Sequence, residues 1–160
     1  MASVRKTAIN TIVSNLGNIT TANSYSFDVG SDRVYRQADN PQVMPTPSVI
    51  VIQGEESIEN EYSDLYECAL EVVIGFVDVY NGDDPEGQAN LFLADIQKAT
   101  GREFRIAATR FGGSVEGTTT VQLAEVSNTV TITDALPGYI LGQAVYEMRY
   151  RRHIEDPNRV

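Results

Sequence analysis

Five carboxylates lie within ten residues in the middle of the chain, between Gly54 and Leu65. Carboxylate oxygens are the ligands that Ca²⁺ and Mg²⁺ prefer, so this stretch offers the chemistry of a metal-dependent hydrolase. The stretch lacks the alternating Asp/Asn spacing and the central glycine of a calcium-binding loop, and no lysine lies near it in the sequence. We therefore expect a solvated acidic loop and no metal site, with the hydrolase as an alternative interpretation. The carboxylates are those of Glu55, Glu56, Glu59, Glu61 and Asp64.

The other residue types that commonly take part in catalysis are isolated from one another in the sequence. His153 is the only histidine and follows Arg151 and Arg152 at the end of a predicted strand, where we expect a surface position. No motif places a serine nucleophile beside a base. Asp83 and Asp84 are explained by a turn and a helix cap. We therefore predict no catalytic residue and no cofactor, and a protein that is not an enzyme.

A basic group near the C-terminus contrasts with the acidic stretch. It consists of Arg149, Arg151 and Arg152, with His153 directly after them. In a monomer these residues would simply belong to the surface. In a closed ring, the basic patch of one subunit and the acidic patch of the next could meet across a heterologous interface. The sequence leaves both interpretations open.

The composition is that of an acidic globular domain. The 160 residues carry a formal net charge of −10, and 42% of them are hydrophobic. This length predicts a single domain, residues 1–160, with a loose C-terminal tail from about residue 153. The acidic balance argues against tight non-specific binding of nucleic acid, which requires clustered Lys and Arg. No segment approaches the roughly 20 apolar residues of a membrane span. The single cysteine, Cys68, is expected to be a small buried hydrophobe in a protein made inside the cell.

Two long strands and two helices must position these residues. Residues 65–80 alternate between apolar and more polar positions with a period of two, and residues 139–152 repeat the pattern. Residues 4–16 and 85–100 have apolar positions at helical spacing. Because few strands alternate with helices, we predict an α+β fold with a mostly antiparallel sheet, long strands and two helices packed on one face.

The shorter elements have weaker signals. A β-branched strand is predicted to end at a glycine, a threonine-rich strand is predicted to be followed by a loop and a further short strand, and one stretch has no clear pattern. The β-branched strand is Ser48–Gln53. The threonine-rich strand is Val115–Val126, the loop after it is at Ser127 and Asn128, and the further short strand is Val130–Thr133. The stretch without a clear pattern is 103–111. Two short strand candidates are Tyr25–Phe27 and Val34–Tyr35.

In its order of features the chain resembles the tail terminator, or tail completion, proteins of long-tailed bacteriophages. The resemblance covers most of the chain outside residues 102–133. It is carried by the helix that begins Val4-Arg5-Lys6, the segment from Arg36-Gln37 to Gly54-Glu55, the long strand followed by Asp83-Asp84-Pro85 and a helix ending Lys98-Ala99, and the closing strand from Val145 to Arg151.

The resemblance implies a structural virion protein. Such a protein forms a ring, in this family a homohexamer, that caps the tail tube, ends its polymerisation and gives the head connector a docking surface. The implied partners are further copies of the chain, the tail tube protein and the head–tail connector protein, while DNA passes through the lumen without specific binding. The implied location is the head-proximal end of the virion tail, after assembly in the host cytoplasm, and no membrane is involved.

The working residues of such a ring would be interface residues. Our candidates are Arg36, Pro45, Pro47, Glu55, Glu56, Glu59, Glu61, Asp64, Arg149, Arg151 and Arg152. Another head–tail joining component, such as a neck or stopper protein, is the alternative in the same setting. The metal-dependent hydrolase and a small binding module for another partner are alternatives of different classes.

Overall fold

The computed structural model of the chain describes residues 3–39, 44–80, 82–109, 116–132 and 137–154. These residues form two α-helices, α1 (Val4–Gly17) and α2 (Pro85–Thr100), three short 3₁₀ turns and six strands. The strands are β1 (Val34–Arg36), β2 (Ser48–Tyr62), β3 (Leu65–Val79), β4 (Glu103–Thr109), β5 (Glu116–Thr131) and β6 (Tyr139–His153). They form one sheet in the order β1-β2-β3-β6-β5-β4, in which only β1 and β2 run parallel.

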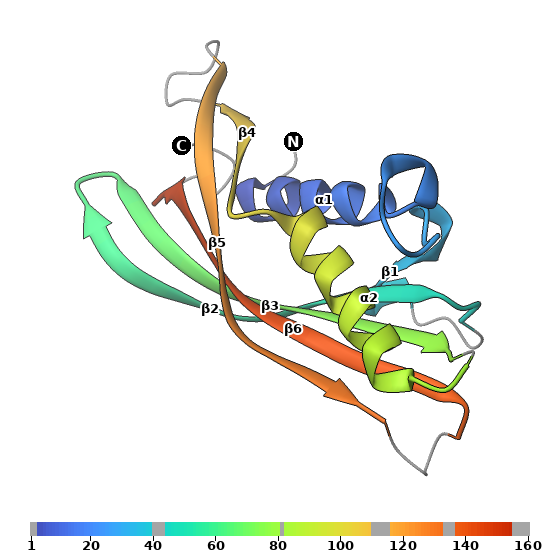
Figure 1. The fold of residues 1–160 in the computed structure, drawn as a ribbon. Coiled ribbons are helices and arrows are strands. Elements are labelled where there is room, and N and C mark those ends of the chain that lie inside the picture. Colours follow the sequence, from blue (N-terminus) through green and yellow to red (C-terminus); the bar gives the residue numbers. More distant parts are fainter. Residues whose placement is uncertain (1–2, 40–43, 81, 110–115, 133–136, 155–160) are drawn as a thin grey trace.

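Both helices lie on the same side of this strongly curved sheet (Figure 1), with α2 against β6, β5 and β3. The predicted α+β class, with a mostly antiparallel sheet and two helices on one face, is therefore confirmed. We call the side that carries the helices the inner face and the opposite side the outer face.

The helices begin and end where their capping residues predict. The Ser3 hydroxyl accepts a hydrogen bond from the Lys6 backbone N–H at 3.1 Å, and the Asp84 carboxylate accepts one from the Gly87 N–H at 2.9 Å. Proline at the first position of α2 needs no hydrogen-bond partner there. Gly101 follows α2 with a φ of +63°, a conformation that glycine adopts without strain.

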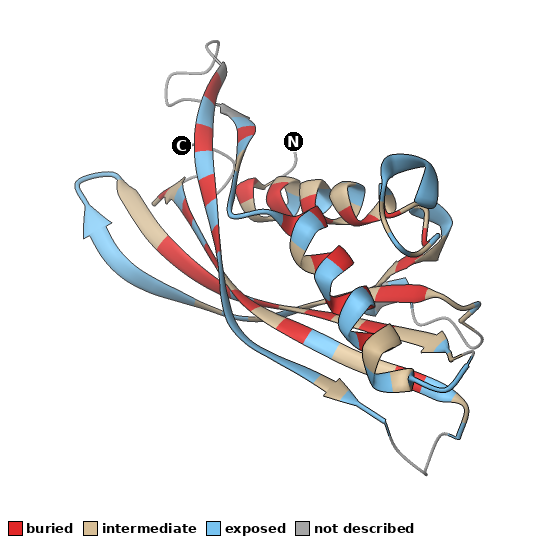
Figure 2. Cartoon of the chain, viewed as in Figure 1, coloured by how far each residue is buried: buried red, intermediate tan, exposed pale blue. Residues whose placement is uncertain are grey.

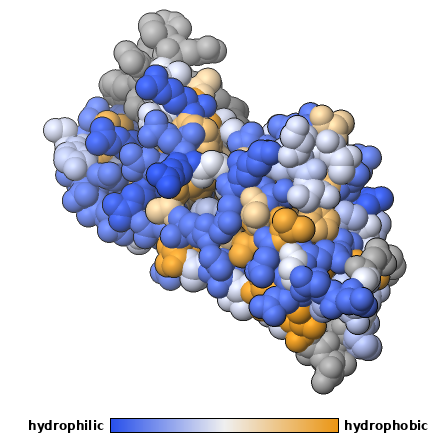
Figure 3. All heavy atoms as spheres, viewed as in Figure 1, coloured by the Kyte–Doolittle hydropathy of each residue, from blue (hydrophilic) through white to orange (hydrophobic). Residues whose placement is uncertain are grey.

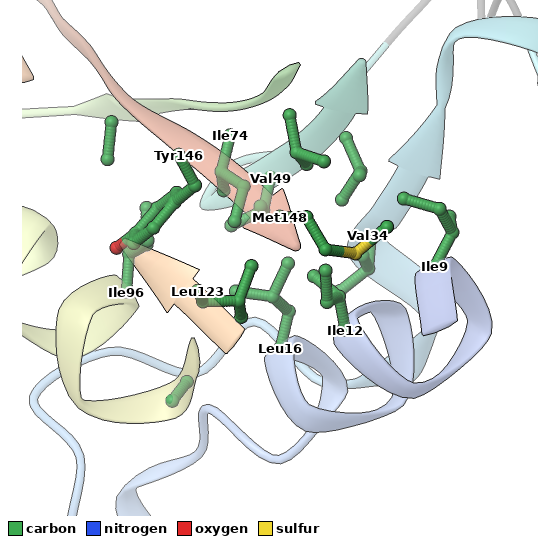
Figure 4. Close-up of a cluster of buried hydrophobic side chains, with 14 of the residues drawn as sticks. Ile9, Ile12, Leu16, Val34, Val49, Ile74, Ile96, Leu123, Tyr146 and Met148 are labelled. Carbon is green, nitrogen blue, oxygen red and sulfur yellow. The ribbon is translucent and has the colours of Figure 1, made fainter. Parts of the chain in front are cut away.

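The core fills the space between the helices and the inner face. Alternate side chains of β3 and β6 are buried, as the period-two pattern predicts, and the buried stripes of both helices pack onto them (Figures 2 and 4). Phe92 of α2 lies between two rings, with centroid distances of 4.4 Å to Phe27 and 4.6 Å to Phe76. The largest fully buried side chains include Ile9, Ile12, Leu16, Leu70, Ile74, Phe92, Ile96, Ile140, Met148 and Tyr150.

The predicted acidic loop is wrong, because the strand does not end at Gly54. β2 continues through the acidic stretch to Tyr62 and pairs with β3 as far as Tyr62 and Leu65. Two register shifts, between Gln53 and Glu56 and between Ile58 and Asn60, accommodate the irregular sequence. The physical reason is that the backbone groups of the long β3 need a partner strand on both sides, and this pairing outweighs the weak strand preference of glutamate.

The second half of the sheet is also more regular than the sequence predicts. β5 is continuous through Ser127 and Asn128, where we predicted a loop, and only a register shift between Glu125 and Ser127 marks the place. β4 occupies most of the stretch for which no pattern was evident and pairs with β5. In both cases the neighbouring strand supplies hydrogen bonds that local sequence cannot reveal.

The segment Tyr25–Phe27, predicted as a strand, is instead a connector held by a carboxylate. The Asp95 side chain of α2, 6% exposed, accepts hydrogen bonds from the backbone N–H groups of Ser26 and Phe27 at 2.8 and 3.0 Å. Burial raises the pKa of Asp95, although the two N–H groups act in the opposite direction. This contact fixes the chain between α1 and β1.

Candidate interaction surfaces

The acidic arm, which we define as residues 55–67, is the end of the β2–β3 hairpin. Residues 57–62 of β2 are all exposed, so neither face of this part of the strand is covered by a helix or another layer. The hairpin turns at Ser63, whose φ is +36°. Of the predicted carboxylates, those of Glu55, Glu59 and Glu61 lie in exposed residues along the arm, and Asp64 is exposed at the turn.

Glu56 is the exception, because it is directed into a polar network that ties the arm to β6. Its carboxylate accepts hydrogen bonds from the Tyr150 hydroxyl and, at 3.2 Å, from the Arg152 guanidinium. The exposed fractions of the Glu56 and Arg152 side chains are 17% and 19%. Burial and the adjacent Glu56 charge raise the pKa of Tyr150, so its hydroxyl remains a donor at neutral pH. Arg152 also lies over the Tyr66 ring, 5.2 Å from its centroid.

The basic end of β6 therefore meets the acidic arm within one chain. Glu67 lies directly opposite Arg151 in the β3–β6 register, and Arg151 lies 5.7 Å from the centroid of the Tyr62 ring. Arg149 pairs with Glu147 at 2.6 Å. The acidic arm and the basic end of β6 lie about 90 residues apart in the sequence, and the β2–β3–β6 strand order brings them together. Of the charge complementarity expected between subunits, the pair of Glu56 and Arg152 is thus satisfied inside the chain.

The predicted surface position of His153 is wrong. His153 is the last residue of β6, is 4% exposed, and has its Nε2 atom 3.8 Å from an Asp64 carboxylate oxygen. The next residue, Ile154, donates its backbone N–H to the Asp64 carbonyl at 2.9 Å. The ordered strand therefore extends one residue further than predicted, because β3 pairs with β6 along its whole length. The remainder of the predicted tail, residues 155–160, lies outside the described residues.

The remaining interface candidates lie at the opposite end of β2. Arg36 ends β1, is half-buried, and donates a hydrogen bond to the Asn10 side chain. Pro45, which is exposed, and Pro47, which is half-buried, precede β2, and the carbonyl of Thr46 between them accepts a hydrogen bond from Arg33 at 2.8 Å. The structure therefore divides the candidates into two groups and does not bring them together.

No constellation for metal chemistry emerges from the described residues. Within them, no group of three or more His, Cys, Asp or Glu side chains is arranged to hold a metal ion. Because the carboxylates of the acidic arm are spread along an extended strand, their side chains diverge instead of converging on one point. Cys68 is fully buried beside Arg152, as the sequence predicted for a small hydrophobe, and burial raises the pKa of its thiol.

The outer face carries an apolar groove that we did not predict. Side chains that alternate with the core residues of β2, β3 and β6 leave a half-buried surface with a hollow of about 530 Å³. Its apolar lining includes Met44, Ile50, Ile52, Val73, Val77 and Leu141. In the view of Figure 3, by contrast, hydrophilic side chains cover most of the surface and apolar ones form small separate patches.

A sequence signal for this outer groove was present. The runs Val49–Ile52 and Val72–Val77 are apolar at consecutive positions, apart from one glycine, and lack the polar alternation of a strand with one wet face. Continuous apolar runs are typical of strands that are covered on both faces. In this chain the helices cover one face only, so the outer groove is a surface suited to contact with another molecule.

Comparison with known proteins adds no assignment to this geometry. No known protein family matches the chain, and no curated protein sequence matches it. Within the described residues, neither helix combines the length and the apolar character needed to cross a bilayer. The surfaces themselves are therefore the basis for a functional proposal.

Proposed function

We propose that this chain is a structural subunit of a phage tail terminator ring. In this role it caps the tail tube, ends tube polymerisation and presents a docking surface to the head connector at the head-proximal end of the tail. The proposal joins the family resemblance of the sequence to the surfaces described above, and it makes self-association the principal activity of the chain.

The observation that carries the proposal is the mismatch between the sheet and its cover. Strands of 15 or 16 residues extend well beyond two helices that cover only one face. The result is an apolar outer groove together with strand segments exposed on both faces. A ring subunit needs contacts to two neighbours, to the tube and to the connector, so several separate interaction surfaces on a small domain are consistent with this role.

The charge of the chain is also consistent with a ring through which DNA passes. A net charge of −10 repels phosphate and disfavours adhesion of the DNA backbone to the wall. The same charge requires that contacts between subunits be made by apolar side chains, backbone hydrogen bonds or locally complementary charges, since like charges at an interface are unfavourable.

The first test is the mass of the native assembly. Six chains of 17.6 kDa predict a particle of about 106 kDa in native mass spectrometry, either in solution or after addition of short tubes of the cognate tail tube protein. Added during tube polymerisation, the protein should shorten the tubes seen by negative-stain electron microscopy, with the ring bound at one end.

Val73→Asp, which places a charge in the outer groove, should weaken ring formation or tube capping. Glu71→Ala changes an exposed side chain on the same strand and face and serves as the matched control. A chain that remains monomeric at every concentration, with and without tubes, would refute the proposal. A ring that binds heads but leaves tube length unchanged would instead identify a neck or stopper component.

A further inference from the structure

The two edges of the sheet are only partly covered, and they are covered at opposite ends. On one edge, β1 pairs with β2 only at Val49–Val51. On the other edge, β4 pairs with β5 only from Glu116 to Gln122. Within the described residues, β2 beyond Val51 and β5 beyond Leu123, whose N–H donates a hydrogen bond to the Arg102 carbonyl, therefore have a neighbouring strand on one side only. Both open segments are largely exposed on both faces, at residues 57–62 and 124–129.

The strand register relates positions on the two edges to each other. Residues that pair in a row across the sheet lie at the same position along the strand direction, which we call the same height. Followed across the sheet, Val51 pairs with Ile74, which pairs with Ala144, which pairs with Asn128, so β1 is level with the open part of β5. In the same way, Ser57 is connected through Ala69, Arg149 and Gln122 to Glu103, so β4 begins level with the acidic arm. The rest of β4 pairs with the part of β5 that precedes its pairing with β6, and this part turns away from the end of the β2–β3 hairpin (Figure 1). Each edge has a short extra strand at the height where the other edge is open.

We infer that copies of this chain join head to tail through these two edges. β4 of one subunit lies along the open edge of the acidic arm of the next, and β1 of that next subunit lies along the open part of β5 of the first. This inference rests on the proposed ring and specifies how its subunits meet. The joint is heterologous, because it uses two different surfaces of the chain, and repetition of such a joint closes a ring when the rotation permits.

Backbone hydrogen bonding favours this joint over contact through the edges of identical strands. Unpaired N–H and C=O groups along an open edge form a ready template for another strand. Two acidic arms placed against each other would repel through Glu55, Glu59 and Glu61. The glutamates and register shifts of the arm therefore disfavour pairing of this edge with a second copy of itself. A strand with basic side chains can still pair with the edge.

β4 is such a strand. Arg105 is exposed on β4 and Arg102 is exposed just before it, against one exposed acidic residue, Glu103. Among the described residues, neither arginine side chain has a hydrogen bond or ion pair. In the joint, these two cations come to lie beside the acidic arm of the neighbouring subunit. Exposed apolar side chains of the open segments are covered at the same time: Ile58 and Tyr62 on the arm, 51% and 50% exposed, and Val126 on β5, 66% exposed.

Disulfide trapping tests the geometry directly. Ser57→Cys and Glu103→Cys place thiols on residues of equal height on the two edges, and the native Cys68 is fully buried and unreactive in the folded chain. The double variant, oxidised under native conditions, should give a ladder of covalent oligomers on non-reducing gels, ending at the ring. Each single variant should remain monomeric on the same gels, because its thiol has no partner thiol across the joint.

A charge exchange provides the second test. Arg102→Glu with Arg105→Glu, or Glu59→Lys with Glu61→Lys, should each weaken assembly at least about tenfold by analytical ultracentrifugation, and the four changes combined should restore it. Lys6→Glu makes the same type of change at an exposed position on α1 and should leave assembly unchanged.

The outcomes separate this inference from the proposed function. Rings of native mass that give no ladder from the double variant would overturn the edge joint and leave the ring intact. A covalent dimer from a single variant would show that an edge pairs with itself and would also overturn the inference. A chain that never assembles would overturn both proposals.

Discussion

Removal of the Glu56 carboxylate should loosen the acidic arm more than any other single charge change in it. Glu56→Ala removes the acceptor of the Tyr150 hydroxyl and the ion-pair partner of Arg152. A hydrogen bond to a charged group contributes about 1.5–3 kcal/mol. The pair with Arg152, whose side chain is one-fifth exposed, adds about 0.2–1 kcal/mol. We therefore expect a loss of about 2–4 kcal/mol in the free energy of opening the arm.

The single cysteine provides the assay. The Cys68 thiol, 0% exposed, lies at the base of the arm beside Arg152, so a thiol reagent reaches it only when the arm opens or the chain unfolds. At constant reagent concentration, a loss of 2 kcal/mol in the free energy of opening should raise the labelling rate about 30-fold. Urea unfolding in parallel separates local opening from global destabilisation, because only the latter moves the unfolding midpoint in proportion.

Two further variants serve as a control and as a test of the hydrogen bond between Tyr150 and Glu56. Glu55→Ala removes a neighbouring exposed carboxylate and should change the free energy of opening by no more than about 0.5 kcal/mol. Tyr150→Phe removes the hydroxyl alone, and its effect combined with Glu56→Ala should be smaller than the sum of the two effects, since both remove the same hydrogen bond. A Glu56→Ala protein that labels at the wild-type rate and unfolds at the wild-type midpoint would refute the role of this network.

Two predictions concern the core beneath the surfaces. Asp95→Ala should lower the free energy of unfolding by about 2–4 kcal/mol, because it leaves two backbone N–H groups without their acceptor, whereas Asp95→Asn keeps an acceptor oxygen. Burial raises the pKa of Asp95, so its contribution is largest at acid pH and is lost as the pH rises through the folded-state pKa. The stability of Asp95→Asn relative to wild type should consequently improve from acid to neutral pH in urea unfolding, and the opposite trend would contradict the burial argument. Gly142→Ala places a methyl group against the Phe76 ring and should cost about 1–3 kcal/mol, and Phe76→Leu in the same chain should recover part of that loss by thermal unfolding.

The elements that could be predicted from sequence are those with strong local signals. α2 has an aspartate cap, a proline at its first position and a glycine after its end, and its predicted boundaries agree with the structure. β3 and β6 have a core residue at every second position over most of their length, because one face of each packs on the helices. Such signals do not depend on the neighbouring strand, so the local sequence was sufficient to predict these elements.

The elements that could not be predicted depend on their neighbours. The end of β2 consists mostly of polar and acidic residues and is a strand because β3 requires a partner there. β4 is a strand because β5 lies beside it. The composition of the acidic arm was visible in the sequence, but the pairing of Glu56 with Arg152 and the burial of His153 follow from strand order, a non-local property.

The lengths of the elements explain why so much of this sheet remains uncovered. A strand of 15 residues such as β3 spans about 50 Å, whereas the 16 residues of α2 span about 24 Å. Even a helix aligned with the strands would cover only half their length. The ends of the hairpin must therefore be held by strand pairing and side-chain networks such as that of Glu56, or by a second copy of the chain. Because the Glu56 network lies within one subunit and the proposed joint lies between two, Cys68 labelling below and above the assembly concentration separates their contributions. A labelling rate that falls on assembly would assign part of the stability of the arm to the neighbouring subunit.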